Sequence, residues 1–486
     1  MKEKKDKSRE EKLLLALGEV DAALVARAIE EPEKKSRGIL TFKGRLPRFT
    51  AAVAALLVVA IGLGVFFGNG LLALGTRAIE SPLYPTMSKM PKNELIPGYD
   101  SRRDAWRADR MLRREYFGAG EGLAPFFAAA TSAILTGGEE NRVYSPLSTY
   151  MALAMLAEVT GGESRAEILT LLGAEDIESL RLQARAVWNA NYCDDGIETS
   201  ILASSIWLSD RLSYNRATLV TLADTYYASS FSGRMGSASY NRALRSWIDG
   251  QTGGLLRGQL DSLAMNEQTA IALVNTLYFK ATWDDKFSDG STRTETFHAP
   301  TGDLLCKFMH ERSAGMYYWG ESFSAVHKSL DESGQMWFIL PDEGVTVNDL
   351  LSDSEALSFL ADPAGHENRA AVMINLALPK FDVSSQLDLT GGLRTLGITS
   401  CLSPDTADFT PLGVADFPVY LESATQGARL TVDEEGVEAA VYTLMLGGGS
   451  AAPPSDEIDF VLDRPFLFVL TSRDGLPLFI GVVNEP

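Results

Sequence analysis

The spacing of apolar residues predicts helices early in the chain and strands late in it. A helical period runs through residues 123–135 and again through 150–172, where Thr160-Gly161-Gly162 interrupts it. Runs rich in Ile, Val, Leu and aromatic residues predict strands. These runs are 201–208, 271–279, 336–340, 372–378, 430–432 and 466–470. Because helices come first, strands follow and no internal repeat is present, we expect residues 104–486 to form one α+β domain.

A long uncharged stretch precedes this domain. No charged residue lies between Arg48 and Arg77, and residues 51–67 are almost wholly aliphatic or aromatic. About 20 apolar residues let a helix cross a hydrocarbon core of about 30 Å, so we expect one transmembrane helix at residues 50–74. A cleaved signal peptide fits less well, because residues 1–49 precede the stretch. A buried core helix is the other alternative, but it would rarely be so free of polar residues.

The segments on either side of this helix differ in character. Residues 1–49 hold 13 Lys+Arg against 9 Asp+Glu. The positive-inside rule therefore places this basic segment in the cytoplasm and the large domain outside the cell. Residues 75–103 contain several prolines, among them Pro82, Pro85 and Pro97, and are expected to form a stalk between the helix and the domain.

Composition and charge exclude several classes of function. The formal net charge of −20 argues against nucleic-acid binding, which needs clustered Lys and Arg. The 3 cysteines, Cys193, Cys306 and Cys401, are widely spaced, so we expect buried free thiols rather than a disulfide framework or a zinc site. The 4 histidines form no HExxH motif, and the chain has neither a GxSxG elbow nor a phosphate-binding loop. We therefore expect no enzyme activity, no metal and no cofactor.

The stretch 434–454 (EEGVEAAVYTLMLGGGSAAPP) joins a strand pattern to a coil-like end. Side chains with the same parity lie on one face of a strand. Val437, Ala439, Val441 and Thr443 have one parity, and Glu438, Ala440 and Tyr442 have the other. The first set carries no charge and would face a packed layer, whereas the Gly and Pro residues that follow favour an exposed coil. This combination is typical of a loop that can add to a sheet as a strand.

The start of this stretch, EEGVEAAVYT, resembles the reactive-loop hinge of the serpins, a family whose loop inserts into a sheet. Four more blocks in the same order are similar to serpin motifs. They are NRVYSPLS at 141–148, LVNTLYFKATW at 273–283, LPKF at 378–381, and RPF at 464–466 with LFIGVVNEP at 478–486. The resemblance runs from about residue 104 to the end. It implies a large central β-sheet with additional sheets, surrounding helices and an exposed reactive loop at about residues 434–460.

The resemblance also implies roles for particular residues, beginning with a hinge at which the loop folds back into the sheet. The hinge residues are Glu434, Glu435, Gly436, Val437, Glu438, Ala439, Ala440 and Val441. Gly436 gives the backbone freedom at the fold-back, and Val437 avoids the high cost of burying a charge. Val441 and Tyr442 are bulkier than the alanines usual in the family, so we expect insertion to be slowed rather than prevented.

A second implied group lies beneath the centre of the sheet, where strands part to admit the loop. Its members are Ser145, Ser148 and Asn275, with Gln426 at a position where the family often has His. Gln donates and accepts hydrogen bonds but does not titrate, so a pH sensitivity is not implied for this chain. Trp283 matches a tryptophan near the point where the loop begins to insert. The alternative interpretation makes Ser145 a helix N-cap and Trp283 a core residue.

The bond that a protease would cut is implied by the family's spacing from Gly436 and falls between Ser450 and Ala451. The span from Gly436 to the RPF block is a few residues longer than usual, so Gly449 and Ala452 remain alternatives. All of these residues are small. They favour a protease with a shallow S1 pocket, such as an elastase-like or subtilisin-like enzyme.

Other proteases fit this loop less well. Residues 438–463 contain no Lys or Arg, which excludes a trypsin-like target. Met445 or Leu446 would suit a chymotrypsin-like enzyme. Cleavage there would leave a shortened inserted strand.

Together these features predict a serpin-type suicide inhibitor of serine proteases, anchored in the membrane of a bacterium by one helix. The target protease would be its covalent partner, and the domain is expected to be monomeric. One alternative is a non-inhibitory serpin-fold protein that acts as a surface binding or chaperone-like protein. The other is a membrane signalling protein, in which residues 1–49 are the functional end and loop cleavage outside is the signal.

Overall fold

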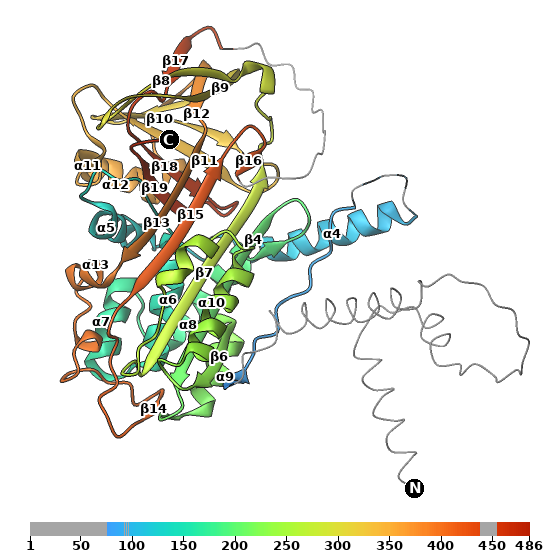
Figure 1. Cartoon of the computed structure of the whole chain (residues 1–486). Helices are drawn as coiled ribbons and strands as arrows, with labels where there is room; N and C mark the ends of the chain where they lie inside the picture. The colour runs from blue at the N-terminus through green and yellow to red at the C-terminus, as the bar shows by residue number, and fades with distance from the viewer. Residues whose placement is uncertain (1–74, 92, 94, 96, 438–453) are drawn as a thin grey trace, which may run out of the picture. The chain divides into compact units, whose positions relative to one another are not determined.

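The computed structural model describes residues 75–91, 93, 95, 97–437 and 454–486, which are arranged around a central β-sheet (Figure 1). This central sheet has eight strands; seven follow the order β1-β6-β4-β7-β16-β15-β13, and β3 pairs with β4. Their bounds are β1 Thr76–Glu80, β3 Cys193–Asp194, β4 Thr199–Ser209, β6 Ala228–Gly233, β7 Ile271–Thr282, β13 Phe381–Asp388, β15 Thr425–Val432 and β16 Gly436–Val437.

Among the described residues, the two-residue strand β16 separates β7 from β15 and covers one end of their facing edges. β16 pairs with β7 at Thr282 and Ala281, and with β15 at Val432. On their other sides, β7 pairs with β4 from Ile271 to Lys280, and β15 pairs with β13 along its whole length. Among the described residues, the central sheet is therefore open between β7 and β15 beyond β16.

A second sheet of nine strands packs beside the central sheet. Eight strands follow the order β17-β12-β9-β10-β11-β18-β19-β2, and β8 pairs with β9. Their bounds are β2 Arg142–Tyr144, β8 Arg293–Ala299, β9 Gly302–Trp319, β10 Phe323–Ser329, β11 Gln335–Pro341, β12 Arg369–Pro379, β17 Glu457–Val461, β18 Phe466–Thr471 and β19 Pro477–Val483. β5 (Ser213–Tyr214) and β14 (Gly413–Val414) form a small separate pair.

Helices surround the sheets, as the ribbon in Figure 1 shows. The α-helices are α4 Tyr99–Arg114, α5 Ala124–Leu135, α6 Pro146–Val159, α7 Gly162–Leu172, α8 Ile177–Asn191, α9 Arg216–Tyr226, α10 Ala238–Gln251, α11 Val347–Leu350, α12 Ser354–Ala361 and α13 Thr390–Thr395, and the 3₁₀ turn η1 is Arg257–Ser262. Nearly every side chain of α6 is buried, as expected for a helix that the core encloses. It therefore forms the back wall behind β7.

The predicted strands lie within observed strands, and the predicted helix at 123–135 matches α5 to within one residue. The other predicted helix is divided in two. The expected helix at 150–172 begins earlier, at Pro146, and is two helices, α6 and α7. The break falls at the glycines: a Cβ on Gly161 would lie 2.6 Å from Asp408 Oδ2, and Gly162 has φ +51°. A side chain fits neither position well, so the chain turns there instead of continuing the helix.

Residues 76–84, part of the predicted stalk at 75–103, lie against the domain in the structure. β1 pairs with the edge strand β6. Tyr84 stacks on Trp188, Tyr192 and Tyr227, with ring centroids 5.9, 5.6 and 6.3 Å away. The prolines keep this segment extended, and an extended segment can lie along a sheet edge.

The predicted transmembrane helix at 50–74 and the basic segment 1–49 lie outside the described residues. Of the helices that the structure describes, none combines the length and the apolar character needed to cross a membrane. The predicted anchor stays a prediction.

Candidate functional site

The hinge of the loop is already paired with the central sheet at Gly436 and Val437. Val437 is 2% exposed and packs in the main core. The turn before it is held by Asp433, whose Oδ1 accepts hydrogen bonds from the backbone N–H of Glu435 (2.9 Å) and of Gly436 (3.3 Å). An Asp side chain that bonds the backbone two or three residues on is a standard way to close a tight turn. The fold-back from β15 into β16 is therefore preformed.

Gly436 is required here by the close approach of two backbones. A Cβ on this residue would lie 2.3 Å from the carbonyl oxygen of Ala281 and 2.7 Å from the Cα of Thr282. Both are backbone atoms of β7 and cannot move aside. Any larger residue would therefore push β16 away from β7.

The acidic pair of the hinge is held by two lysines. Glu434 accepts a hydrogen bond from Thr292 (2.8 Å) and lies 2.5 Å from Lys380 Nζ, and Glu435 pairs with Lys286. Burial alone would raise the pKa of Glu434, but the hydrogen bonds from Lys380 and Thr292 outweigh it and hold the pKa below its usual value. Glu434 is therefore charged at neutral pH. Its ion pair holds the hinge beside Lys380, which lies between β12 and β13.

Trp283 joins the hinge to the core. Its indole Nε1 donates to the carbonyl of Asp433 (2.8 Å), and its backbone N–H donates to the carbonyl of Glu435 (3.0 Å). The ring is 1% exposed and meets Phe287 edge-on. Trp283 is therefore a core residue that also contacts the hinge, and its role at the start of insertion stays a prediction.

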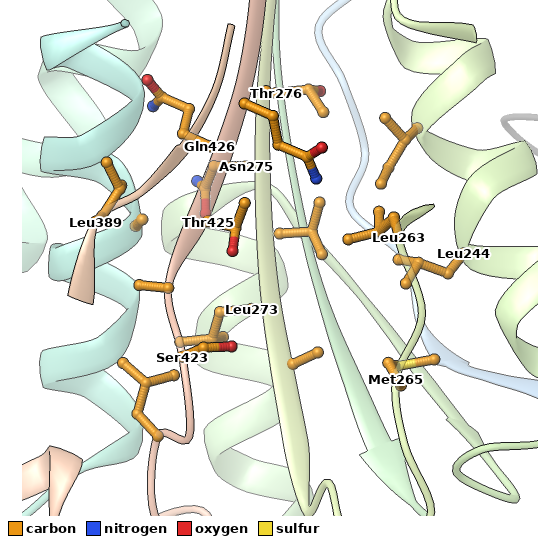
Figure 2. Close-up of a pocket in the computed structure, with 18 of the residues that line it drawn as sticks. Leu244, Leu263, Met265, Leu273, Asn275, Thr276, Leu389, Ser423, Thr425 and Gln426 are labelled. Atoms are coloured by element: carbon orange, nitrogen blue, oxygen red, sulfur yellow. The ribbon is translucent and has the colours of Figure 1, made fainter. Parts of the chain in front are cut away.

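A cavity of about 300 Å³ lies between β7 and β15, beyond the end of β16 (Figure 2). We call it the slot. α6 lines one side of the slot, which we call its back, and α10 and η1 line the opposite side, its front. The turn before β15 closes one end. Its polar lining includes Ser148, Thr149, Asn275, Thr276 and Gln426, and its apolar lining includes Leu244, Leu263, Met265, Leu273 and Leu389. Three of the predicted cluster residues therefore line one cavity.

Gln426 ties β15 to the start of α6. Its Oε1 accepts from Ser145 N (2.7 Å), and its Nε2 donates to Ser145 O (3.2 Å) and to Thr149 Oγ1 (3.3 Å). Ser145 in turn caps α6, because its Oγ accepts from Ser148 N (3.1 Å). Ser145 is the N-cap of α6, and Gln426 contacts it; the role of this group in admitting the loop stays a prediction. Thr149 belongs to this cluster and was missed from the sequence, although it is one helical turn from Ser145.

Asn275 occupies the β7 side of the slot and is only partly satisfied. Its Nδ2 donates to Ser204 Oγ (2.8 Å) on β4 and lies 3.7 Å from Met155 Sδ on α6. Its Oδ1 is buried and has no hydrogen-bond partner among the described residues. A buried acceptor without a partner costs about 1–3 kcal/mol, so this atom would gain from a donor placed in the slot.

The segment after α10 crosses the front of the slot and is bonded to the far side. Gln259 Nε2 donates to Ala428 O (3.5 Å), and Ser262 Oγ donates to Gln386 (3.2 Å). Asn266 Nδ2 donates to both carboxylate oxygens of Glu422 (3.2 Å each). These contacts connect the β7 half of the sheet with the β15 half. None of them could be deduced from the sequence, because they join residues more than 100 positions apart.

The rest of the predicted loop lies outside the described residues. This applies to the hinge residues Glu438, Ala439, Ala440 and Val441, and to the candidate cleavage residues Gly449, Ser450, Ala451 and Ala452. In the part of the chain that the structure does describe, no group of three or more His, Cys, Asp or Glu side chains could hold a metal ion.

Comparison with known proteins identifies this arrangement. The family model described as "Serpin (serine protease inhibitor)" matches residues 127–486. The chain belongs to the serpin family. A protein named "Serine protease inhibitor" from Cyanea capillata is 29% identical over 376 residues, which cover 73% of this chain and 95% of the relative.

Solved serpin structures have the same fold. The native stressed conformation of an Arabidopsis serpin is 26% identical, has a TM-score of 0.64, and is matched over 77% of this chain and 98% of that one. The thermophilic serpin tengpin in its native state has a TM-score of 0.66 at 24% identity, over 75% of this chain and 93% of that one, and shows the fold alone. The serpin fold predicted from the motifs is confirmed, and the relatives are named as inhibitors of serine proteases rather than as enzymes.

Proposed function

We propose that this serpin is a suicide inhibitor of serine proteases whose loop, once cut, inserts as a new strand between β7 and β15. The observation that carries the proposal is the agreement between the slot and the loop sequence. β16 already occupies the first two positions of such a strand. Its pairing therefore defines which residues of β7 and β15 each later loop residue would meet.

On the core side, the register brings small and apolar residues to a packed layer. Val437 pairs with Ala281 and Val432, and each later loop residue meets the preceding residue of both neighbours. Residues directly opposite each other share a face of the sheet. Ala439, Val441 and Thr443 would thus follow Val437 into the core, as the parity of the sequence predicts.

Thr443 would meet two of the polar residues that line the slot. In the continued register it lies opposite Asn275 on β7 and Gln426 on β15, which line the cavity together. In the inserted strand its hydroxyl would be a donor on the same face as Asn275 Oδ1, the acceptor that lacks a partner among the described residues. Insertion would therefore add packing and satisfy a buried polar atom.

On the front face the larger and charged residues also find suitable neighbours. Glu438 would lie opposite Lys280, and Tyr442 would lie between Thr276 on β7 and Gly427 on β15. Gly427 leaves room on the β15 side, where the nearest side-chain atom to an added Cβ is Gln259 Oε1 at 3.3 Å, from the segment that covers the slot. This supports insertion that is slowed by the cover over the slot rather than blocked by the loop's own side chains.

The mechanism follows from a loop that is held back until it is cut. A protease attacks the loop near Ser450 and forms an acyl-enzyme through its own Ser-His-Asp triad. Cleavage removes the constraint at the C-terminal end of the loop, so the strand inserts and carries the bound protease with it. The native state is then a kinetic trap, and its persistence is described by a rate rather than by an equilibrium. This protein supplies the bond that is cut and the slot that receives the loop, whereas the catalytic groups belong to the protease.

The target and the location belong to the same proposal. Small residues at Gly449, Ser450, Ala451 and Ala452 favour elastase-like or subtilisin-like enzymes with a shallow S1 pocket. The uncharged stretch 50–74 behind a basic segment supports a single-pass protein in a bacterial cell membrane, with the serpin domain outside.

A denaturing gel tests the inhibitory function. The full chain is incubated with an elastase-like serine protease, and we expect a covalent band near the summed mass, with a C-terminal fragment whose mass identifies the cut bond. The full chain is needed because a boundary at residue 104 would remove β1 and the first turn of α4. Cleavage without the band, and with an unchanged melting temperature of the cut protein, would contradict insertion and favour the non-inhibitory binding protein.

A further inference from the structure

Helix α4 lies outside the residues that the family model matches, yet it is fixed to the domain by buried charges. Arg113 lies 2.8 Å from Glu198, and both side chains are at most 5% exposed. Arg110 Nε lies 2.6 Å from Asp195, to which the indole of Trp106 also donates (2.9 Å). Removing one partner of such a buried pair leaves an uncompensated buried charge and is strongly destabilising, so α4 is held firmly in place.

Arg110 also contacts a second part of the fold. Its Nη1 donates to the backbone carbonyl of Glu332 (3.0 Å) and to the Glu332 carboxylate (3.0 Å). Arg473 donates to the same two groups of Glu332, at 2.9 and 2.6 Å. Glu332 has φ +51°, a left-handed conformation that residues other than Gly rarely adopt. Two arginines thus hold a strained residue in the turn between β10 and β11.

This turn is bonded directly to the end of β7. The N–H of Asp331 donates to Thr282 O (2.8 Å), and Leu330 forms an isolated β-bridge with Trp283. Asp284 N donates to Ser329 O (3.0 Å) on the other side of the bridge. The position of Glu332 therefore fixes the backbone at the end of β7.

The same end of β7 carries the hinge. Thr282 pairs with Gly436, and Trp283 donates to the carbonyls of Asp433 and Glu435. A continuous series of contacts therefore runs from α4 through the Glu332 turn and Trp283 to the hinge. β16 is the element of this series that we expect to open first, because two paired residues are described for it and short elements open at lower free energy than long ones.

We propose that α4 keeps the reactive-loop hinge docked in the central sheet through Arg110 and the Glu332 turn. Displacement of α4 would relax Glu332, loosen the end of β7 and release Gly436 and Val437. Coupling of this kind is reciprocal, so withdrawal of the hinge would loosen α4 to the same degree. The α4 helix, which follows directly after the segment that leads to residues 1–74, would thus act as a regulator of the loop. Docking of the hinge requires no protease. Only the effect of α4 on inhibition rests on the proposed function.

Hydrogen exchange of the full chain without protease tests the coupling. Arg110→Lys keeps a positive charge beside Asp195 but removes the fork that also reaches Glu332. Glu332→Ala removes the carboxylate, which is 47% exposed, and provides a second variant if the first folds poorly. Arg216→Lys is the matched control, because Arg216 pairs with Glu80 of β1 at 2.7 Å on the surface.

We expect Arg110→Lys and Glu332→Ala to speed exchange of the amides in 281–283 and 433–437 at least tenfold, and Arg216→Lys to leave them unchanged. If exchange in α4 rises while the hinge amides keep their original rate, α4 and the hinge are independent and the proposal fails. It fails equally if neither variant alters the hinge. Both results are independent of the gel assay, so a failure of inhibition and a failure of coupling are distinguishable.

Discussion

The side-chain amide of Gln426 makes a two-way contact with the backbone of Ser145: its Oε1 accepts from Ser145 N at 2.7 Å, and its Nε2 donates to Ser145 O at 3.2 Å. β15 is thereby tied to the first turn of α6 at the edge of the slot. A donor and an acceptor on one side chain are both needed for this contact. Gln supplies a donor and an acceptor at any pH, whereas a histidine offers both only while its ring is neutral.

Replacing Gln426 with Leu should lower the free energy of unfolding by about 1–3 kcal/mol, because buried polar groups of Ser145 and Thr149 lose their partner. Thermal or denaturant unfolding measures the change. Gln268→Leu is the control, since Gln268 is exposed in the turn before β7 and its loss should cost less than about 0.5 kcal/mol. Equal effects of the two substitutions would contradict the role given to Gln426.

Gly436→Ala should convert the inhibitor into a substrate. The added Cβ would collide with the backbone of β7 at Ala281 and Thr282, so β16 could not stay paired and the cut loop could not insert from this end. We expect continued cleavage with little or no covalent complex on a denaturing gel. Gly391→Ala on α13 is the control, because a Cβ there meets no atom within 4 Å. A normal yield of complex from Gly436→Ala would exclude the hinge as the start of insertion.

The stabilising effect of Glu434 should depend on pH. Its pKa is lowered in the folded state, because hydrogen bonds from Lys380 and Thr292 outweigh the effect of burial. A lowered folded pKa gives stability that is present above the unfolded value of about 4.5 and is lost as the pH falls through the folded value. The melting temperature of Glu434→Gln should therefore lie below that of the unmodified protein at neutral pH.

The melting temperatures of Glu434→Gln and of the unmodified protein should converge as the pH falls below the unfolded value of about 4.5 and then through the lowered folded value, since both side chains are then uncharged. Glu435→Gln is the neighbouring control, because its carboxylate is 53% exposed and its pairing with Lys286 should contribute less than about 1 kcal/mol. A gap between Glu434→Gln and the unmodified protein that persists at low pH would show that the effect is not electrostatic.

Much of the fold was predictable because its motifs are local. The hinge sequence, the N-cap at Ser145 and the strand containing Asn275 are read from short runs of residues, and their resemblance to serpin motifs implies a sheet that parts to admit a loop. The parity pattern placed Val437 on the packed face, and Val437 is buried; the residues after it lie outside the described part of the chain. The structure adds that Gly436 and Val437 are docked before any cleavage, which depends on contacts with β7 and β15 that no local pattern contains.

The contacts that hold the hinge could not be predicted, because they join distant parts of the chain. Lys380 and Lys286 look like ordinary surface lysines, and nothing near Glu332 in sequence indicates that Arg110 reaches it. Asp195 and Glu198 stand in a polar run that suggests a solvated turn, yet both are 2% exposed because α4 covers them. The expectation of a stalk at 75–103 came from proline content alone. Composition does not show that an extended segment has a sheet edge and an aromatic surface to lie on.

Tyr84 should be a main attachment of this N-terminal segment. Its ring stacks on Trp188, Tyr192 and Tyr227, and its hydroxyl donates to the carbonyl of Tyr227 at 3.4 Å. Tyr84→Ala should therefore destabilise the fold by about 2 kcal/mol or more, as expected for truncation of a packed aromatic ring. Leu83→Ala is the adjacent control, because Leu83 is 91% exposed and should tolerate the change. Equal melting temperatures for the two variants would mean that the segment contributes little to stability.

The register of insertion can be tested with one substitution at two neighbouring positions. Continued from β16, Ala439 would lie opposite Phe279 and Leu430, both of which are buried in the main core. Ala440 would lie opposite Tyr278 and Arg429 on the front face. Ala439→Glu would thus force a charge into an apolar layer, at a cost that blocks insertion. Ala440→Glu would place the same charge beside a guanidinium.

Ala439→Glu should therefore be cleaved without forming the covalent complex, whereas Ala440→Glu should retain most of the complex seen with the unmodified protein. A denaturing gel read beside the melting temperature of each cut protein measures both. Only inserted loops should raise the melting temperature, because they add a strand to the central sheet. The reverse order of the two variants would mean that the strand inserts one residue out of register, since a shift of one position exchanges the two faces. Equal complex from both would mean that the loop does not enter the slot at this depth.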